Sequence, residues 1–348
     1  MSTGLIYPPC SYAQPEELVE LCKVVAEHHG IFVTHIRNES DYLLESMNEV
    51  IDVSEKAGVA LHMSHFKAAG QANWPKVKEA LALVDDARSR RNVDMTFDQY
   101  PYIAGSTMLD AVIPHWAHVG GSEKLLERLQ NPADQERIKK NWDGSEKIPG
   151  WDNMVTWSGW EGILITWVRS DKNKPFEGKT IAEIAKIVEK DPPKTVFDLL
   201  MEEELAVSMV DFWGREEDVA TVMKHEAHMV GTDGLLGGRP HPRVYGTYPR
   251  ILGKFVREDG ILPLREALRK MTAFPAQRLG LQDRGMIREG LAADITIFDP
   301  EHVIDRGTYQ DPIQFPEGIK YVFVNGVVVN EKGHHTGKLP GKVLRHQA

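Results

Sequence analysis

Cysteine is scarce in this chain, which has only Cys10 and Cys22 among 348 residues. Neither belongs to a Cys-x-x-Cys pair, and two separated cysteines exclude the disulfide framework that small secreted domains use. Cys22 falls in an amphipathic helical stretch, where we interpret it as a small core residue. Cys10 follows two prolines in a loop and is assigned no role.

Long apolar runs and basic clusters are lacking as well. No stretch approaches the roughly 20 apolar residues of a membrane span, and the first residues show no charged segment followed by an apolar one. The net charge is −10, and no basic stripe alternates with aromatic residues as nucleic-acid binding requires. We therefore expect a cytoplasmic protein without a membrane or nucleic-acid partner, and 42% hydrophobic residues suffice for a large core.

The first hundred residues repeat one unit, in which a helical stripe is followed by a short β-branched run. Helical spacing of apolar residues predicts helices over 14–29, over a stretch from 43 that ends at Gly58, and over 74–90. The runs after them, 31–36, 59–65 and 93–100, predict buried parallel strands. His35 and His65 end the first two strands 30 residues apart, which is the period of a βα unit.

Successive βα units form either an open doubly wound sheet or a closed barrel. No Gly-x-Gly-x-x-Gly phosphate loop follows any of the predicted strands, and a polar residue ends each of them. We therefore predict an α/β fold with a TIM-like (β/α) barrel, of which the chain contributes residues 1–107 and 220–290. The second part contains a strand over 228–233 and a helix over 264–272.

Two further regions break the βα rhythm. Residues 108–219 hold seven of the eight tryptophans and two helical segments, which predicts an insertion on the active-site face that could act as a lid. Residues 291–348 alternate apolar and polar positions, and Asn325-Gly326 between two apolar runs is a strong hairpin signal. We expect these last residues to form part of a small β domain.

Three strand-end residues predict a metal site. His35, His65 and, after a later strand, Asp233 would meet at the mouth of the barrel within reach of one ion. Two imidazoles and a carboxylate suit Zn²⁺, with Mn²⁺, Co²⁺ or Fe²⁺ as alternatives. A carboxylate beside a metal can remove a proton from a bound water, and Asp233 is the candidate.

Basic residues lie next to these predicted ligands. Side chains two apart on a strand share a face, so Arg37 is expected to point with His35, and Lys67 with His65. Arg243 follows Asp233 in a loop and offers a planar donor suited to carboxylates. We predict that these residues bind the substrate; salt bridges in loops are the alternative for each.

At this point the chain resembles the N-acyl-D-amino-acid deacylases, or D-aminoacylases, of the amidohydrolase superfamily. The resemblance covers essentially the whole chain, and its segments include residues 2–9, 34–39, 64–67, 98–107, 231–234, 240–243, 269–272 and 292–295. It implies that His35 and His65 bind one or two zinc ions, that Asp233 is the catalytic base and a metal-site residue, and that Tyr100 steadies the oxyanion. It also implies that Lys67, Tyr100, Ser106 and Arg243 hold the substrate, an N-acyl-D-amino acid that is hydrolysed to a carboxylate and a free D-amino acid.

The chain departs from that family in one respect. The family carries a His-x-His pair and a metal-binding cysteine on earlier strands, and no His-x-His occurs in these 348 residues. We therefore expect only the later barrel strands, five to eight in the family, with self-association or a complementing N-terminal segment as candidate partners.

Two alternatives remain at the level of sequence. A cyclic amidohydrolase of the dihydropyrimidinase or hydantoinase type shares barrel and metal, although Lys67 and Arg243 would then have no substrate carboxylate to bind. An inactive remnant that lacks the His-x-His half of the metal site is the other.

Overall fold

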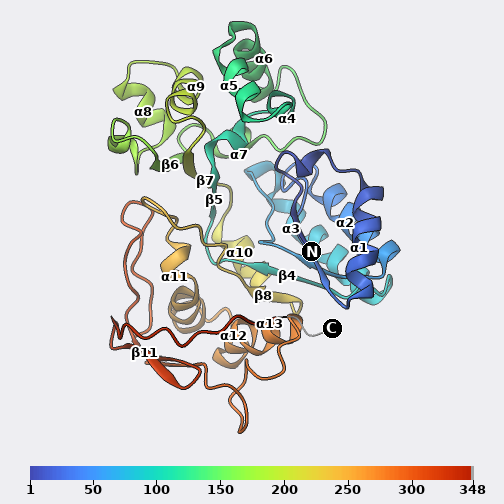
Figure 1. Ribbon diagram of the computed structural model, residues 1–348, viewed down its shortest axis with the longest axis vertical. Helices are drawn as coiled ribbons and strands as arrows, with labels where there is room; N and C mark the ends of the chain where they lie inside the picture. The colour runs from blue at the N-terminus through green and yellow to red at the C-terminus, as the bar shows by residue number, and fades with distance from the viewer. Residues whose placement is uncertain (346–348) are drawn as a thin grey trace.

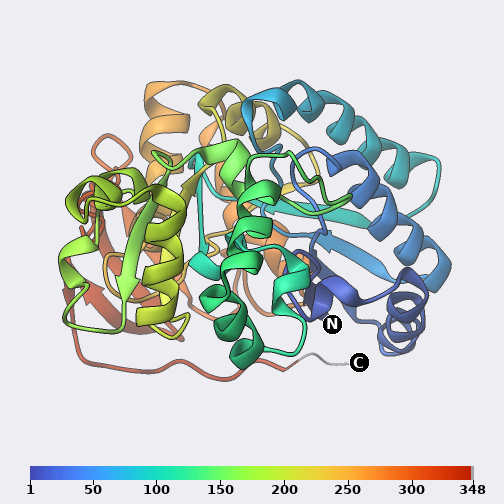
Figure 2. The ribbon, with the colours of Figure 1, turned by 90° about the horizontal axis from the view of Figure 1, so that it is seen from above.

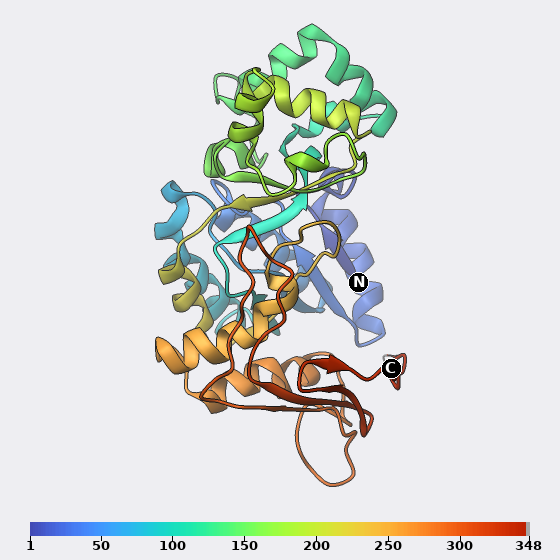
Figure 3. The ribbon, with the colours of Figure 1, turned by 90° about the vertical axis from the view of Figure 1, so that its left-hand side faces the viewer.

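A computed structural model describes residues 1–345, which form an elongated α/β structure in three tiers (Figure 1). A parallel sheet with its helices lies in the middle. A unit that combines an antiparallel sheet with helices lies at one end, and a small antiparallel sheet lies at the other (Figure 3). None of the helices in the described part of the chain combines the length and hydropathy that a bilayer crossing requires.

The middle tier is a five-stranded sheet in which all neighbouring strands are parallel. Its order is β1 (Ser2–Gly4), β2 (Ile31–His35), β3 (Ala60–Met63), β4 (Met95–Gln99) and β8 (His228–Val230). Helices α1 (Pro15–Glu27), α2 (Leu43–Ala57) and α3 (Val77–Ser89) connect the first four strands and pack side by side (Figure 2). The three predicted βα units are therefore present, with β1 as an additional strand that the sequence interpretation did not contain.

Apolar side chains from the sheet and from these helices form the core of the tier. Phe32, Leu61 and Phe97 from the strands pack with Met47 and Val84 from the helices, and all five are fully buried. Each such side chain contributes about 1.5–3 kcal/mol relative to an exposed one. Helix α2 ends at Gly58, whose φ of 66° is the left-handed conformation that terminates helices and that glycine adopts without strain.

The strands end earlier than predicted, and this matters for the site. β3 ends at Met63 instead of residue 65, and β8 ends at Val230 instead of residue 233. His65 and Asp233 have φ values of 39° and 46°, which interrupt the extended backbone of both strands. Both side chains therefore belong to bends that follow the strands, and non-glycine residues held in this region are common at functional sites.

The insertion contains an antiparallel sheet that the sequence interpretation did not predict. Its strands are β5 (Ala104–Met108), β7 (Val207–Phe212) and β6 (Ile163–Val168), with β7 in the centre. Its helices are α4 (His115–His118), α5 (Ser122–Gln130), α6 (Pro132–Trp142), α7 (Met154–Ser158), α8 (Ile181–Ile187) and α9 (Pro192–Glu202). Trp142 stacks on Phe197 with ring centroids 5.2 Å apart, so this tryptophan is a core residue of the unit.

The chain then returns to the parallel sheet and ends in the third tier. The helices of this part are α10 (Glu216–Met223), α11 (Arg243–Arg250), a π-helix (Ile251–Glu258), α12 (Leu264–Met271) and α13 (Ala273–Arg278). The small sheet is antiparallel in the order β12 (His334–His335), β11 (Val327–Glu331), β10 (Ile319–Val324) and β9 (Ile295–Phe298). As predicted, Asn325 and Gly326 form the β10–β11 turn, both with positive φ.

Candidate active site

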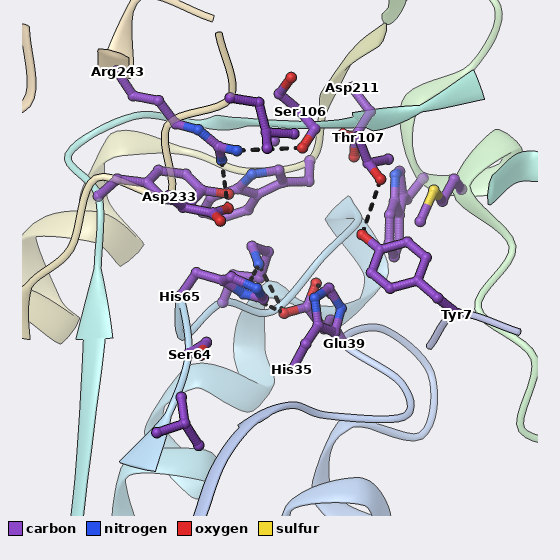
Figure 4. Close-up of a pocket in the computed structure, with 18 of the residues that line it drawn as sticks. Tyr7, His35, Glu39, Ser64, His65, Ser106, Thr107, Asp211, Asp233 and Arg243 are labelled. Carbon is purple, nitrogen blue, oxygen red and sulfur yellow. Dashed lines mark hydrogen bonds and ion pairs between the residues drawn. The ribbon is translucent and has the colours of Figure 1, made fainter. Parts of the chain in front are cut away.

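A cavity of about 360 Å³ lies where the middle tier meets the insertion (Figure 4). Side chains that follow β2, β3 and β4 form one wall, and β5 and β7 form the opposite wall. The residues that line the cavity include Tyr7, His35, Glu39, His65, Lys67, Tyr100, Ser106, Thr107, Trp157, Asp211, Trp213, Asp233 and Arg243. Seven of the eight predicted site residues therefore share one cavity, and Arg37 is the exception.

His35 and His65 are brought together with a glutamate that was not predicted as a site residue. The two imidazole rings meet edge to face with centroids 4.3 Å apart. Glu39 Oε2 lies 3.5 Å from His35 Nε2, and Glu39 Oε1 lies 3.0 Å from His65 Nδ1. One donor atom from each of the three residues falls within 4.8 Å of the others, which is a geometry that could hold a metal ion.

The state of His35 agrees with a ligand role. Burial lowers the pKa of His35 well below its usual value, so the ring is neutral near pH 7, with His65 and Lys67 acting in the same direction and Glu39 opposing them. Its Nε2 is buried and has no hydrogen-bond partner. A neutral imidazole with a free nitrogen next to a carboxylate fits the nitrogen and oxygen ligands that zinc takes in proteins.

Lys67 supplies the positive charge that Glu39 needs in the protein interior. The ammonium donates to Glu39 Oε1 at 2.7 Å and lies 2.7 Å from His65 Nδ1. Burial by itself would raise the pKa of Glu39, but Lys67, His35 and His65 together hold it below its usual value. Glu39 is therefore ionised near neutral pH, and its pair with Lys67 is buried on both sides.

Arg243 and Asp233 form a second ion pair on another side of the cavity (Figure 4). Arg243 Nη1 lies 2.9 Å from Asp233 Oδ2, and its side chain is only 1% exposed against 40% for that of Asp233. The guanidinium lies 4.6 Å from the centroid of the Tyr100 ring and donates to the carbonyl oxygen of Ser106 at 3.3 Å. Asp233 does not belong to the cluster of His35, Glu39 and His65 whose donor atoms approach each other.

A partly buried carboxylate, that of Asp98, positions His65. Asp98 Oδ1 accepts a hydrogen bond from the His65 backbone amide at 2.9 Å, and Asp98 Oδ2 lies 2.8 Å from His62 Nε2. The side chain passes β8 at Gly231, where a Cβ atom would lie 2.5 Å from Asp98 Oδ1. Glycine at position 231 is therefore required for the hydrogen bond that holds the bend of His65.

The structure corrects the prediction for Arg37. Its guanidinium turns away from the cavity, binds the carboxylate of Glu49 with a shortest distance of 2.7 Å and donates to the carbonyl oxygens of Ser11 and Ala13. Residue 37 lies beyond the end of β2, so the alternation of strand faces that predicted a shared direction with His35 no longer applies. Arg37 therefore ties the loop after β1 to helix α2.

Two acidic residues of the cavity were missed by reasoning from sequence. Glu39 belongs to segment 34–39, one of those that carry the family resemblance, and it lies four residues after His35. It follows the strand in a loop whose path the sequence pattern does not specify. Asp211 lies on β7, in a sheet that was not predicted at all. An acidic residue inside the apolar run 207–213 was the available signal, since buried carboxylates are rare without a role.

The insertion also supports the loop that carries Glu39. Asp152 precedes α7 and accepts hydrogen bonds from the Glu39 backbone amide at 2.7 Å and from the Ser40 hydroxyl. Burial raises the pKa of Asp152 to about 7, against the lowering effect of these two hydrogen bonds. The insertion therefore helps to fix the position of the candidate metal ligand as well as covering the cavity.

Comparison with known proteins shows what the chain resembles. Residues 168–330 match the model of the amidohydrolase family. A D-aminoacylase of Alcaligenes xylosoxydans xylosoxydans is 33% identical over an alignment that covers 100% of this chain and 61% of that relative. The chain is similar in sequence to a D-aminoacylase along its full length. The resemblance predicted from the sequence motifs is thereby confirmed.

Two further proteins show the same similarity. An N-acyl-D-glutamate deacylase of the same organism is 35% identical, with 100% of this chain and 61% of the relative aligned. A crystal structure of N-acyl-D-glutamate deacylase from Bordetella bronchiseptica, complexed with zinc and a phosphonate that mimics the tetrahedral intermediate, is 32% identical. It superimposes with a TM-score of 0.76 over 94% of this chain and 59% of that one. The chain thus spans about 60% of the length of these relatives.

Proposed function

We propose that this chain carries part of a zinc-dependent amidohydrolase site and hydrolyses the amide bond of N-acyl-D-amino acids to a carboxylate and a free D-amino acid. The observation that carries the proposal is the cluster of His35, Glu39 and His65, which shares one cavity with two buried cations. The related deacylases act on N-acylated D-amino acids, and the preference for the D enantiomer is taken from them.

One or two zinc ions are the proposed cofactor, since the related deacylase from Bordetella was solved with zinc. His35 and His65 are the proposed ligands, as the sequence predicted, with Glu39 as a third donor. Bound zinc would polarise the substrate carbonyl and lower the pKa of a water molecule. Asp233, predicted as both ligand and base, keeps only the second role in this proposal because it pairs with Arg243 instead of joining the cluster.

Each of the other predicted cavity residues has a separate role in this proposal. Arg243 and Lys67 bind the substrate carboxylate, and for this each must loosen its present carboxylate partner. When the substrate takes over Arg243, Asp233 is released to accept the proton of the attacking water and to pass it to the leaving nitrogen. Burial raises the pKa of Tyr100 well above its usual value, so its protonated hydroxyl can donate to the developing oxyanion. Ser106 is the proposed polar contact for the acyl group.

The five parallel strands are, in this proposal, the later strands of a (β/α) barrel. Their uninterrupted parallel order supports it, and the outer strands β1 and β8 have no further neighbour within residues 1–345. Open strand edges of this kind pair readily with another chain or segment. Self-association or a complementing segment therefore stays a prediction.

The two alternatives fit less well. A cyclic amidohydrolase would leave Lys67 and Arg243 without a substrate carboxylate, and two relatives that align with the whole chain are a D-aminoacylase and an N-acyl-D-glutamate deacylase. An inactive remnant has no need for the buried ion pair of Lys67 and Glu39 in the cavity, and it predicts that little zinc binds.

The test combines metal content with turnover. The purified chain is equilibrated with zinc and dialysed, its zinc is measured by elemental analysis, and release of free amine is followed with N-acetyl-D-methionine and N-acetyl-L-methionine. We expect bound zinc and turnover of the D enantiomer only. His65→Asn should lose both, whereas His225→Asn, a histidine paired with Asp85 outside the cavity, should lose neither.

Unchanged zinc binding in both His35→Asn and His65→Asn would remove the proposed metal site. Turnover of neither enantiomer by the zinc-loaded chain would refute the proposed activity. Turnover of hydantoin in its place would favour the cyclic amidohydrolase.

A further inference from the structure

Asp211 is a buried carboxyl group in the cavity to which the proposed reaction gives no role. It lies in the centre of the insertion sheet, on β7, opposite Gly105 of β5 and Ile163 of β6. Its side chain lies above Gly105, where a Cβ atom would come within 2.8 Å of Asp211 Oδ1. Glycine at position 105 therefore leaves the space that the carboxyl group occupies on the cavity wall.

The charges of the cavity leave Asp211 without a partner. Lys67 is paired with Glu39, and Arg243 with Asp233. No cation lies within 4 Å of the Asp211 carboxyl group, and no other side chain donates a hydrogen bond to it, in the part of the chain that the structure describes. Burial raises the pKa of Asp211 to about 7, with Lys67 and Arg243 too distant to reverse the effect. A carboxylate at only 5% exposure needs a partner that the protein does not supply.

The position of Asp211 within the cavity indicates which part of a substrate it would meet. Asp211 lies beside Thr107, and the pair of Arg243 and Asp233 lies on the opposite side of the cavity (Figure 4). In the proposed function, the histidine cluster receives the amide and the two cations receive the α-carboxylate. The substrate side chain is then the remaining group that can face Asp211.

We propose that Asp211 forms the side-chain subsite of the deacylase and selects N-acyl-D-amino acids with a cationic side chain, such as lysine or arginine. This inference rests on the proposed function. A side-chain ammonium or guanidinium would pair with Asp211, the one carboxyl group among the described residues of the cavity that lacks a counter-ion. A charge-assisted hydrogen bond of this kind is among the stronger polar contacts. An acidic side chain would be repelled, because two carboxylates would then share a buried site. The related N-acyl-D-glutamate deacylase therefore differs from this chain in the substrate side chain it accepts.

Ligand binding tests this subsite independently of turnover. Trp157 and Trp213 line the cavity, so quenching of tryptophan fluorescence reports binding of N-acetyl-D-lysine, N-acetyl-D-norleucine and N-acetyl-D-glutamate to the zinc-equilibrated chain. Lysine and norleucine have aliphatic chains of similar reach and differ in the terminal charge. We expect the lysine compound to bind about 10- to 100-fold more tightly than the norleucine compound, the range of a charge-assisted hydrogen bond, and the glutamate compound to bind most weakly.

Asp211→Asn should abolish this preference while changing the norleucine affinity less than about threefold, since the side chain keeps its size and loses only its charge. Asp110→Asn is the matched control. Asp110 is a carboxyl group of the same unit whose pKa burial raises to about 6, and it does not line the cavity, so the preference should remain. Gly105→Ala, which crowds the Asp211 carboxyl group, should reduce the preference without removing a charge, and it serves if Asp211→Asn does not fold.

A lysine preference that survives Asp211→Asn, equal affinities for lysine and norleucine, or no saturable binding of any of the three compounds would each overturn the subsite. Binding with the expected preference but without amine release would support the subsite and count against the proposed hydrolysis. The two proposals can thus fail separately.

Discussion

The two walls of the cavity are built from different kinds of structure and carry charge in different ways. The wall that follows the parallel strands holds His35, Glu39, His65 and Lys67. The Glu39 carboxylate lies within 3.5 Å of a nitrogen atom of each of the other three side chains, and Lys67 also contacts His65. The antiparallel wall of the insertion presents a single carboxyl group, Asp211, with no ion pair among the described residues. One wall is internally neutralised and preorganised, and the other is left to be completed by a ligand.

This difference separates two tasks. Preorganised polar groups suit chemistry, because they need no rearrangement when charge develops. An incomplete group suits selectivity, because it favours only a ligand that supplies the missing partner. Insertions of this kind can therefore change the substrate side chain while the parallel strands keep the reaction. Substitutions in the two walls should also differ in how much unfolding free energy they cost.

The largest effect is expected from Lys67→Met. The substitution leaves Glu39 buried at 5% exposure without its ammonium partner, and breaking such a pair costs about 3–5 kcal/mol of unfolding free energy. Urea denaturation at pH 7 measures it. The double variant Lys67→Met with Glu39→Gln should recover a large part of the loss, because no unpaired charge then remains. A loss below about 1 kcal/mol in the single variant would mean that Glu39 is not held by Lys67.

The periodicity of the sequence predicted most of the wall that follows the parallel strands. Helical spacing and β-branched runs located β2, β3 and β4, and the 30-residue period placed His35 and His65 at the same edge of the sheet. Lys67 and Tyr100 reached the cavity as expected because they follow the ends of these strands closely. For these residues the strand pattern was sufficient.

The strand pattern did not predict the side-chain direction of Arg37, the ion pair of Asp233 with Arg243, or the sheet that carries Asp211. Arg37 faces helix α2 because the strand ends at His35, and Asp233 pairs with Arg243 because the bend after β8 sets its direction. Strand β7 pairs with β5 about one hundred residues earlier, and nothing local in the sequence encodes that pairing. Asp211 therefore became a candidate only through tertiary structure.

An intermediate, pH-dependent effect on stability is expected from Asp152, the residue of the insertion that holds the loop of Glu39. The pKa of Asp152 rises from 3.8 to about 7 on folding, so the protonated carboxyl group is favoured in the folded state. Its contribution to stability is fully present below pH 4 and is lost as the pH rises through about 7. At about 1.4 kcal/mol per pKa unit, this shift corresponds to about 4 kcal/mol of unfolding free energy between low and high pH. We expect at least about half of it to be measured, because the surroundings of the ionised carboxylate relax.

Asp152→Asn separates this contribution from those of other groups. The amide keeps an oxygen for the Glu39 backbone amide but cannot ionise, so the variant should gain stability relative to the natural chain as the pH rises from 4 to 8. Thermal and urea unfolding at several pH values measure the difference. A difference that does not change with pH would show that Asp152 ionises freely in the folded protein.

The smallest effect is expected from the direct hydrogen bond between the two walls. The Thr107 hydroxyl on β5 donates to Tyr7 Oη at 3.0 Å, and Tyr7 packs edge to face on His35 with centroids 5.2 Å apart. Thr107→Val and Tyr7→Phe each remove the bond, and each should cost about 0.5–1.5 kcal/mol, the usual net value of a buried hydrogen bond. The double variant should cost little more than either single one, because both remove the same bond and leave two apolar groups in contact. Additive losses would show that the two walls are held together through other contacts, and the insertion could then adjust its position, and with it Asp211, without disturbing His35.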